Sequence, residues 1–355
     1  MIGYRLKNAR AKSGLSLRDL ESKVGNLVSA QAIGKYERDE MMPSSKVLMA
    51  LAEALEVSES YLLSPSAIAL EGVEFRKNRL TSKREEASVE ASVLSAVERY
   101  LQIEDLLAAP SATWTPPPGA PFRVKTIEDA ESAAIRLRQL WELGLDPIPS
   151  LVEFLEEKGI KVIHQPLEPA VSGMMCFVRK QQDGQVPVIV VSSNINGERQ
   201  RFTLAHELGH LVLDVDGPLD EERASHRFAG AFLMPAEVLR AEIGEHRTAI
   251  SLGELFQLKR LFGVSALAIA YRCKDLGILS AKGLGQLFAI FTNKGWRKPP
   301  YPEPEQIQPE ESTRFKRLCF RALAEGLISE AKAAELLETT VRQLVRDMEG
   351  PRAAS

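Results

Sequence analysis

The sequence predicts an α+β protein of several domains: an N-terminal bundle of five helices, a central domain with a small sheet, and a C-terminal helical region. Two observations indicate this division. Residues 1–63 contain closely spaced short amphipathic segments, and β-like runs occur only in the middle of the chain. With 355 residues, 45% of them hydrophobic, the chain is long and apolar enough for two or three cores.

Composition and charge exclude several classes of protein. A formal net charge of −3 argues against a chain that binds nucleic acid along its whole length, so any DNA contact must be local. Cys176, Cys273 and Cys319 stand singly, which argues against a disulfide framework and against a thiolate zinc site. No apolar run reaches membrane-spanning length. We therefore expect a cytoplasmic protein without a membrane partner.

Residues 1–64 are predicted to form the N-terminal helical domain. Ser16 and Ser29 are suited to cap helices, and Gly25-Asn26 breaks the chain between two of them. Helices this short and this close together in the sequence predict a compact bundle.

The rest of the chain divides where its composition changes. Residues 65–122 are charged helical sequence followed by the Pro-rich "APSATWTPPPGAP", which predicts a helical and extended linker. Residues 123–297 form the predicted central domain, where "IKVIH", "SGMMCFVRK" and "VPVIVVS" are typical of strands. A second Pro-rich break, "KPPYPEPE", precedes the helical region 298–355. The apolar stripe of this C-terminal region is more typical of a dimer or docking surface than of a DNA-binding surface. We assign no catalytic or ligand-binding role to it.

The stretch "RFTLAHELGHLVLD", residues 201–214, carries the strongest chemical signal. Helical periodicity places His206 and His210 one turn apart on the same face, which is the spacing of two metal ligands. Glu207 lies about 100° round the helix, close enough to act as a general base on water at the metal. The pentapeptide "HELGH" fits the zinc-peptidase pattern H-E-x-x-H. The alternative is a plain helix that carries two ordinary histidines.

A catalytic zinc site needs a third protein ligand. The residues alone leave five carboxylates open: Asp214, Asp216, Asp220, Glu221 and Glu222. Asp214 would lie too far along an undistorted helix to share the metal with His206. Gly217-Pro218 reverses the chain, and "DEERASHRFAGAFLMP" begins a second helix that can pack back against the first.

"HELGH", followed by "ERASHRFA" from Glu222 to Ala229 and then by "LMP", resembles the ImmA/IrrE family of zinc metallopeptidases. The resemblance implies a zincin-like central domain, bound Zn²⁺, a protein substrate, and a third zinc ligand at Glu222, with Ser225 as the small residue of the second helix. Glu221 is the competing assignment. The pattern departs at His226, where an Asn or Asp is common; we interpret His226 as a residue that orients a ligand, with a ligand or a capping role as alternatives.

This site predicts peptide hydrolysis without a covalent intermediate. Zinc would polarise the scissile carbonyl, while Glu207 takes a proton from water and passes it to the leaving amine. The strand "VPVIVVSSN" is a candidate edge that pairs with an extended substrate, and an ordinary core strand is an equally good interpretation.

The N-terminal segment, which includes "SLRDLESKVGNLVSAQAIGKYERDE", resembles a Cro/repressor-type (XRE) helix-turn-helix domain over its whole length. The resemblance implies a recognition helix capped by Ser29, with Ala30 and Gln31 at the end where base edges are read. Gln31 is the best base reader, because its amide can pair with adenine through two hydrogen bonds. Arg18 and Lys35 are expected to contact phosphates.

Two features qualify the DNA-binding hypothesis. The turn "VGNLVS" is about two residues longer than the usual form, and the segment's charges nearly balance. A helix-turn-helix used for protein contacts, or a plain helical bundle, therefore stays an alternative. Arg10 and Glu37 occupy the positions of a buried ion pair in that family, and we assign them to structure.

These features together favour a DNA-binding regulator with zinc-dependent endopeptidase activity that cleaves a regulatory protein. Its expected partners are operator DNA and a protein substrate, such as a repressor or a toxin partner, and a homodimer is an option. The second hypothesis is a non-proteolytic regulator or antitoxin that uses the peptidase fold as a sensing or partner-binding scaffold. The intact set His206, Glu207, His210 and Glu222 favours the first, because a scaffold has no need of a base beside the ligands.

Overall fold

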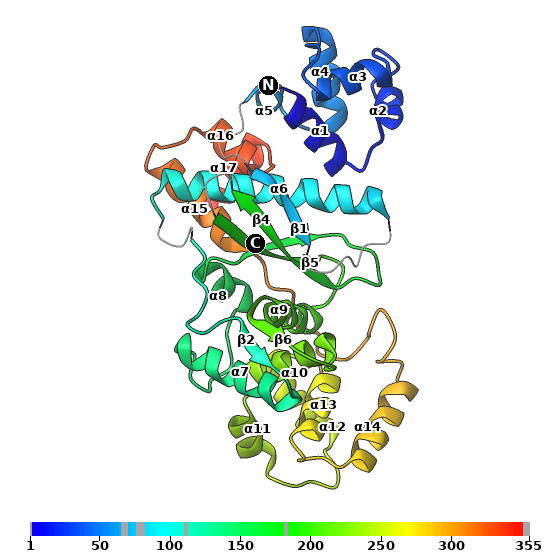
Figure 1. The fold of residues 1–355 in the computed structure, drawn as a ribbon, viewed down its shortest axis with the longest axis vertical. Coiled ribbons are helices and arrows are strands. Elements are labelled where there is room, and N and C mark those ends of the chain that lie inside the picture. Colours follow the sequence, from blue (N-terminus) through cyan, green and yellow to red (C-terminus); the bar gives the residue numbers. More distant parts are fainter. Residues whose placement is uncertain (1, 65–69, 76–81, 110–112, 181–183, 351–355) are drawn as a thin grey trace, which may run out of the picture. The chain divides into compact units, whose positions relative to one another are not determined.

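A computed structural model of the chain describes residues 2–64, 70–75, 82–109, 113–180 and 184–350. The fold is α+β, as predicted, and the helices dominate (Figure 1). The chain divides into two compact units. Unit 1 comprises Met1–Thr113, Cys176–Val188 and Ser312–Ser355, and unit 2 comprises Trp114–Met175 and Ile189–Glu311. The predicted domain boundaries after residues 64, 122 and 297 stay predictions.

Four strands form the larger sheet. They are β1 (Leu70–Phe75), β3 (Lys161–Gln165), β4 (Gly173–Lys180) and β5 (Gly184–Ser192), hydrogen-bonded in the order β1-β4-β5-β3. The strand β1 falls within the predicted linker and pairs antiparallel with β4, a pairing that the sequence alone did not indicate. Of the two interpretations of "VPVIVVSSN", the free edge is wrong and the core strand is confirmed, because β5 has a strand on each side.

The N-terminal bundle contains α1 (Ile2–Lys12), α2 (Leu17–Lys23), α3 (Ala30–Glu37), α4 (Ser45–Leu55) and α5 (Glu59–Leu63). A serine precedes each of the last four helices, and its Oγ accepts a hydrogen bond from the backbone N–H three residues on. The fully buried side chains of the core are Leu6, Leu20, Ile33, Leu51 and Leu62. The predicted ion pair is confirmed, with Arg10 Nε 2.5 Å from Glu37 Oε1.

Part of the predicted linker is a long helix, α6 (Lys83–Leu106), that packs inside unit 1. Two of its acids are buried, and each is paired with a base from another helix. Arg5 of α1 donates to both oxygens of Glu98, at 2.5 and 2.7 Å, and Arg314 donates to Glu104 at 2.9 Å. Because an unpaired buried charge is strongly destabilising, these pairs fix the position of α6 against its neighbours.

The C-terminal helices of unit 1 are α15 (Thr313–Ala324), α16 (Glu330–Leu336) and α17 (Val341–Glu349). Much of the apolar stripe noted in the sequence is used inside this unit. It packs against the end of α6 in a core that contains Ile103, Leu107, Cys319, Ala322, Ala333, Leu336 and Leu344. The predicted homodimer stays a prediction.

Unit 2 is built mainly of helices around a short parallel strand pair. The strands are β2 (Phe122–Val124) and β6 (Leu213–Val215). The helices are α7 (Ile127–Leu140), α8 (Leu151–Glu157), α9 (Gly197–Val212), α10 (Glu221–Leu233), α11 (Ala236–Ile243), α12 (Leu252–Phe262), α13 (Ala266–Asp275) and α14 (Ala281–Asn293). Helix α10 packs against both α9 and α7 (Figure 1). None of the helices in the described ranges has the length and apolarity that a membrane span requires.

The last segment of unit 2, residues 303–311, holds the start of α9. The Ile307 carbonyl accepts a hydrogen bond from the Gly197 N–H at 3.0 Å, and Glu198 Oε1 accepts one from the Ile307 N–H at 3.1 Å. Glu310 forms an ion pair with Arg201 and accepts a hydrogen bond from the Val152 N–H at 2.8 Å. The helix that carries the histidines is therefore fixed by residues about a hundred positions later in the chain.

Candidate metal centre

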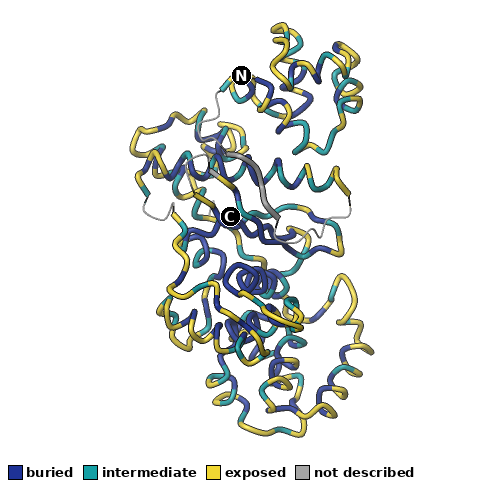
Figure 2. The backbone as a smooth tube through the Cα atoms, in the orientation of Figure 1, coloured by how far each residue is buried: buried dark blue, intermediate teal, exposed yellow. Residues whose placement is uncertain are grey.

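Helix α9 lies in the interior of unit 2 (Figure 2). It begins at Asn196, whose side chain accepts a hydrogen bond from the Arg199 N–H at 3.1 Å. Every residue of the helix is buried except Arg199 and Phe202. The polar groups of His206, Glu207 and His210 are therefore held in a site that is largely shielded from water.

The two histidines and one glutamate of the neighbouring helix converge on one point. His206 Nε2 and His210 Nε2 lie 3.1 Å apart. The Glu222 carboxylate lies 3.3 Å from the first nitrogen and 3.4 Å from the second. Among the described residues, these side chains form the group of potential ligands that could hold a metal ion, with one ligand atom from each within 4.8 Å of the others. Two imidazoles and one carboxylate fit the donor set of zinc.

Small residues allow α10 to approach α9 closely enough for this convergence. A Cβ added at Gly209 would lie 3.3 Å from Ser225 Cα and 3.2 Å from the Phe228 ring, so a larger residue there would push α10 away. Ser225 is fully buried at the same crossing. The close contact with α10 therefore accounts for the glycine at the fourth position of "HELGH".

Glu221 occupies a different position from Glu222. Its Oε1 lies 2.9 Å from His210 Nδ1, on the side of the ring opposite the converging atoms. Ser225 Oγ lies 3.4 Å from the same nitrogen. A carboxylate that accepts a hydrogen bond from Nδ1 fixes the tautomer in which Nε2 is available to a metal. The geometry therefore favours Glu222 as the third ligand and Glu221 as the residue that orients His210.

His226 lies beside His206 but outside the converging group. Their ring centroids are 4.5 Å apart at 50°, and His226 also contacts the Phe202 ring, 5.7 Å away. The His226 side chain is exposed to the adjacent pocket. This position suits contact with a bound ligand as well as the predicted orienting role.

Glu207 is buried next to the start of β4. Its exposed fraction is 2%, and a Cβ added at Gly173 would lie 3.7 Å from Glu207 Cγ and 2.5 Å from Thr203 Cγ2. Glycine at this position therefore lets β4 pass directly over α9. The contact restricts the side chain that the sequence predicts as the general base.

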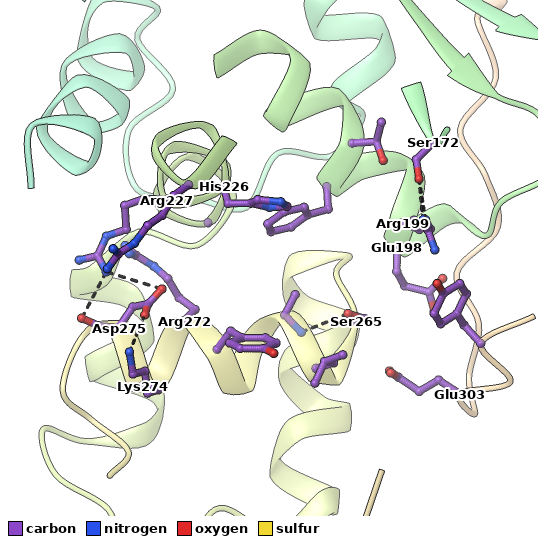
Figure 3. Close-up of a pocket in the computed structure, with 18 of the residues that line it drawn as sticks. Ser172, Glu198, Arg199, His226, Arg227, Ser265, Arg272, Lys274, Asp275 and Glu303 are labelled. Atoms are coloured by element: carbon purple, nitrogen blue, oxygen red, sulfur yellow. Dashed lines mark hydrogen bonds and ion pairs between the residues drawn. The ribbon is translucent and has the colours of Figure 1, made fainter. Parts of the chain in front are cut away.

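A pocket of about 890 Å³ opens beside the histidines. Its walls come from α9, α10 and α13, and from the segment around Trp296 and Tyr301. Figure 3 shows His226 between the two ends of this pocket. Arg227, Arg272, Lys274 and Asp275 gather at one end, and Ser172, Glu198, Arg199 and Glu303 gather at the other.

Most charges around this pocket are paired within unit 2. Glu131 of α7 pairs with Arg227 at 2.6 Å and with Arg272 at 2.6 Å. Burial raises the pKa of Glu131, but the hydrogen bonds and charges of Arg272 and Arg227 outweigh it, so this pKa lies below its ordinary value. At the other end, the fully buried Lys259 lies 2.5 Å from Glu198 and 2.9 Å from Glu303. Sequence reasoning missed these pairs, because their members are far apart in the chain.

The predicted DNA-contact residues lie at the surface of the N-terminal bundle. Ser29 Oγ accepts a hydrogen bond from the Ala32 N–H at 3.3 Å and so caps α3. Arg18, Ser29, Gln31 and Lys35 are exposed, and Ala30 is half-buried. The first turn of α3 therefore presents polar side chains to solvent, as a recognition helix must.

Comparison with known families agrees with the two predicted kinds of domain. Residues 155–274 match the family described as the IrrE N-terminal-like domain, a peptidase family, and residues 6–62 match the helix-turn-helix domain. The chain thus joins a helix-turn-helix domain to an IrrE-like metallopeptidase domain. Both resemblances seen in the sequence are confirmed, and the first match includes α9 and α10. None of the curated proteins matches the chain.

Proposed function

We propose that this chain is a DNA-binding regulator whose IrrE-like domain is a zinc-dependent endopeptidase that cleaves a regulatory protein. The observation that carries this proposal is the convergence of His206, His210 and Glu222, with one ligand atom from each within 4.8 Å of the others. Glu207 lies beside them on α9 and is buried. A metal-binding scaffold without catalysis does not need a buried carboxylate at that position.

The proposed chemistry divides among four side chains. A zinc ion bound by the three ligands would polarise the scissile carbonyl and activate water near neutral pH. Glu207 accepts a proton from the attacking water and then donates it to the amine nitrogen as the C–N bond breaks. Glu221 keeps the His210 ring oriented through Nδ1.

The helix-turn-helix domain supplies the proposed DNA contact. Gln31, exposed at the start of α3 beside Ser29 and Ala30, would read a base edge. Arg18 and Lys35 are exposed cations suited to phosphate contacts. Operator DNA would then determine where the peptidase acts.

The test of the peptidase proposal is Glu207→Gln in the full-length chain loaded with Zn²⁺. Incubation with a soluble cell lysate, followed by mass spectrometry of new protein N-termini, reports cleavage of whichever protein in the lysate is the substrate. We expect specific new termini with the wild type and none with Glu207→Gln, while both proteins bind about one zinc per chain. Glu237→Gln, an exposed acid on α11, is the matched control and should cleave like the wild type.

Two outcomes would contradict the proposal. Cleavage by Glu207→Gln at the wild-type level would remove Glu207 as the general base. A wild-type chain that takes up no zinc would remove the zinc-dependent mechanism altogether. If regulation of a reporter gene in cells is unchanged by Glu207→Gln, the peptidase fold acts as the scaffold of the second hypothesis.

A further inference from the structure

The pocket beside the proposed metal-ligand group contains an arginine, Arg199, that forms no ion pair with any acid of the described residues. We propose that Arg199 selects peptide substrates that carry a carboxylate about two to four residues from the scissile bond. This inference rests on the proposed peptidase function and names the substrate class of that site.

Arg199 is on the one strip of α9 that remains open to the pocket. All other residues of the helix are buried except Phe202, and both of these side chains line the pocket. Arg199, Phe202 and His206 follow one another at steps of three and four residues, so they share one face of the helix. That face runs from the pocket to His206, whose ring lies 4.5 Å from that of His226, a residue that lines the pocket.

The Arg199 guanidinium is held in place and still has donor capacity. Its Nε and Nη2 donate to Ser172 Oγ at 2.9 and 2.6 Å, as Figure 3 shows. The guanidinium also lies over the Tyr301 ring, 4.7 Å from the centroid. Among the described residues, no acceptor lies within hydrogen-bond distance of its Nη1. A half-buried, oriented guanidinium of this kind is suited to bind a carboxylate.

The acids at this end of the pocket form no ion pair with Arg199, because both are turned toward another cation. Glu198 and Glu303 lie 2.5 and 2.9 Å from the buried Lys259. At the opposite end, Asp275 lies 3.6 Å from Arg227 and 3.6 Å from Lys274. Two exposed lining residues remain, Arg223 and Glu128, and their charges are opposite in sign. Arg199 is therefore a guanidinium of the pocket that forms no ion pair within the described residues, and its remaining donors are available to a ligand.

Helix geometry sets the distance between the carboxylate and the cleaved bond. Arg199 precedes His206 by seven residues, which corresponds to about 10 Å along an α-helix. An extended peptide covers about 3.3 Å per residue, so this distance corresponds to about three residues. Because the arginine side chain is long, the expected separation between the carboxylate and the cleaved bond is about two to four residues.

The test measures peptide binding to the zinc-loaded Glu207→Gln protein, which does not depend on turnover. The probes are fluorescent decapeptides with blocked ends in which a single Glu is moved through every position of a Gln-containing parent, and fluorescence anisotropy gives their affinities. A charge-assisted hydrogen bond predicts that one Glu position binds about tenfold more tightly than Gln. In a wild-type cleavage assay, that position should lie two to four residues from the cut.

Variants assign the preference to Arg199. With zinc content unchanged, Arg199→Gln should reduce the Glu-to-Gln affinity ratio to about one, and Arg199→Lys should keep part of it. Lys282→Gln removes an equal charge from the exposed surface of α14, outside the pocket, and should leave the ratio at its wild-type value. A parent peptide with a free C-terminus tests whether the bound carboxylate is the chain end instead of a side chain.

The outcomes separate this inference from the proposed function. Cleavage of the peptides by the wild type without any Glu preference would overturn the role of Arg199 and leave the peptidase intact. A preference that survives Arg199→Gln would overturn it as well. Preferential binding that depends on Arg199, with no cleavage by the wild type, would support the carboxylate site and contradict the peptidase.

Discussion

Helix α9, which carries the two proposed metal-ligand histidines, and helix α3, which is proposed to read DNA, are organised in opposite ways. In α9 the functional side chains point inward, and only two residues of the helix are not buried. In α3 the buried residues are Ile33, Gly34 and Tyr36, whereas Gln31 and Lys35 face solvent. The inward site depends on partners from distant parts of the chain, and the outward site depends on little more than its own helix. Substitutions should therefore affect stability in the first region and recognition in the second.

The largest expected effect comes from Gly197→Ala at the start of α9. A Cβ there would overlap the Gln308 carbonyl and lie 2.6 Å from the Ile307 oxygen, and both are backbone atoms that cannot rotate away. We expect the free energy of unfolding of unit 2 to fall by about 3 kcal/mol, measured by denaturant titration. DNA affinity should be unchanged.

The matched control is Gly285→Ala in the interior of α14, where an added Cβ meets nothing within 4 Å. This change should raise stability by about 0.5–1 kcal/mol, because alanine is the better helix former. Equal effects at the two glycines would show that the segment 303–311 does not hold α9 in solution.

A smaller effect is expected from Glu131→Gln, which removes the acid shared by Arg227 and Arg272. The folded-state pKa of Glu131 is lowered, so its ionised form stabilises the fold above the unfolded-state pKa of about 4.3, and this contribution is lost as pH falls through the folded-state pKa. We expect a loss of about 2 kcal/mol at pH 7. Unfolding titrations should show the difference from wild type shrinking between pH 5 and pH 3.

The pH dependence separates this effect from a loss of packing. A loss that stays constant down to pH 3 would mean that the charge of Glu131 does not contribute. The exposed Glu237→Gln should change stability by less than about 0.5 kcal/mol at either pH.

Substitutions in α3 should have the smallest effect on stability but a measurable effect on DNA recognition. Gln31→Ala should reduce discrimination at one base pair by about 1–3 kcal/mol, measured with a panel of operator variants. Lys35→Ala should instead weaken binding to all sequences alike and reduce the slope of affinity against salt by about one. Neither change should alter unfolding. If the wild type shows no salt-sensitive DNA binding, the alternative of a domain that contacts a protein is favoured.

Features that depend on the spacing of residues close together in the chain can be predicted from the sequence. His206 and His210 are four residues apart, so their common face is visible in the letters, and the caps at Ser16 and Ser29 are equally local. The partners of the buried charges are not visible, since Glu131 and Arg272 are 141 positions apart. The strand β1 was missed, and the choice between edge and core strand for β5 stayed open, for the same reason: pairing in a sheet is decided between distant segments.

The candidate site shows the same limit at the level of single residues. The resemblance to the family selected Glu222 over Glu221, but the contact between Glu221 and His210 Nδ1 emerges only when α10 is packed on α9. The proposed role of Arg199 could not be predicted from the sequence, because arginine is common in helices. Its position beside buried or already paired residues is known only from the structure.

The late segment that holds the start of α9 has a consequence for biosynthesis. Gln200 accepts a hydrogen bond from the Glu310 N–H across 110 positions, and Lys259 needs Glu303 as well as Glu198. On a translating ribosome, the histidines emerge well before the carboxylates that steady their helix. A nascent chain halted before residue 303 would therefore contain all of α9 but lack the segment that holds its start, so the IrrE-like domain would still be incomplete.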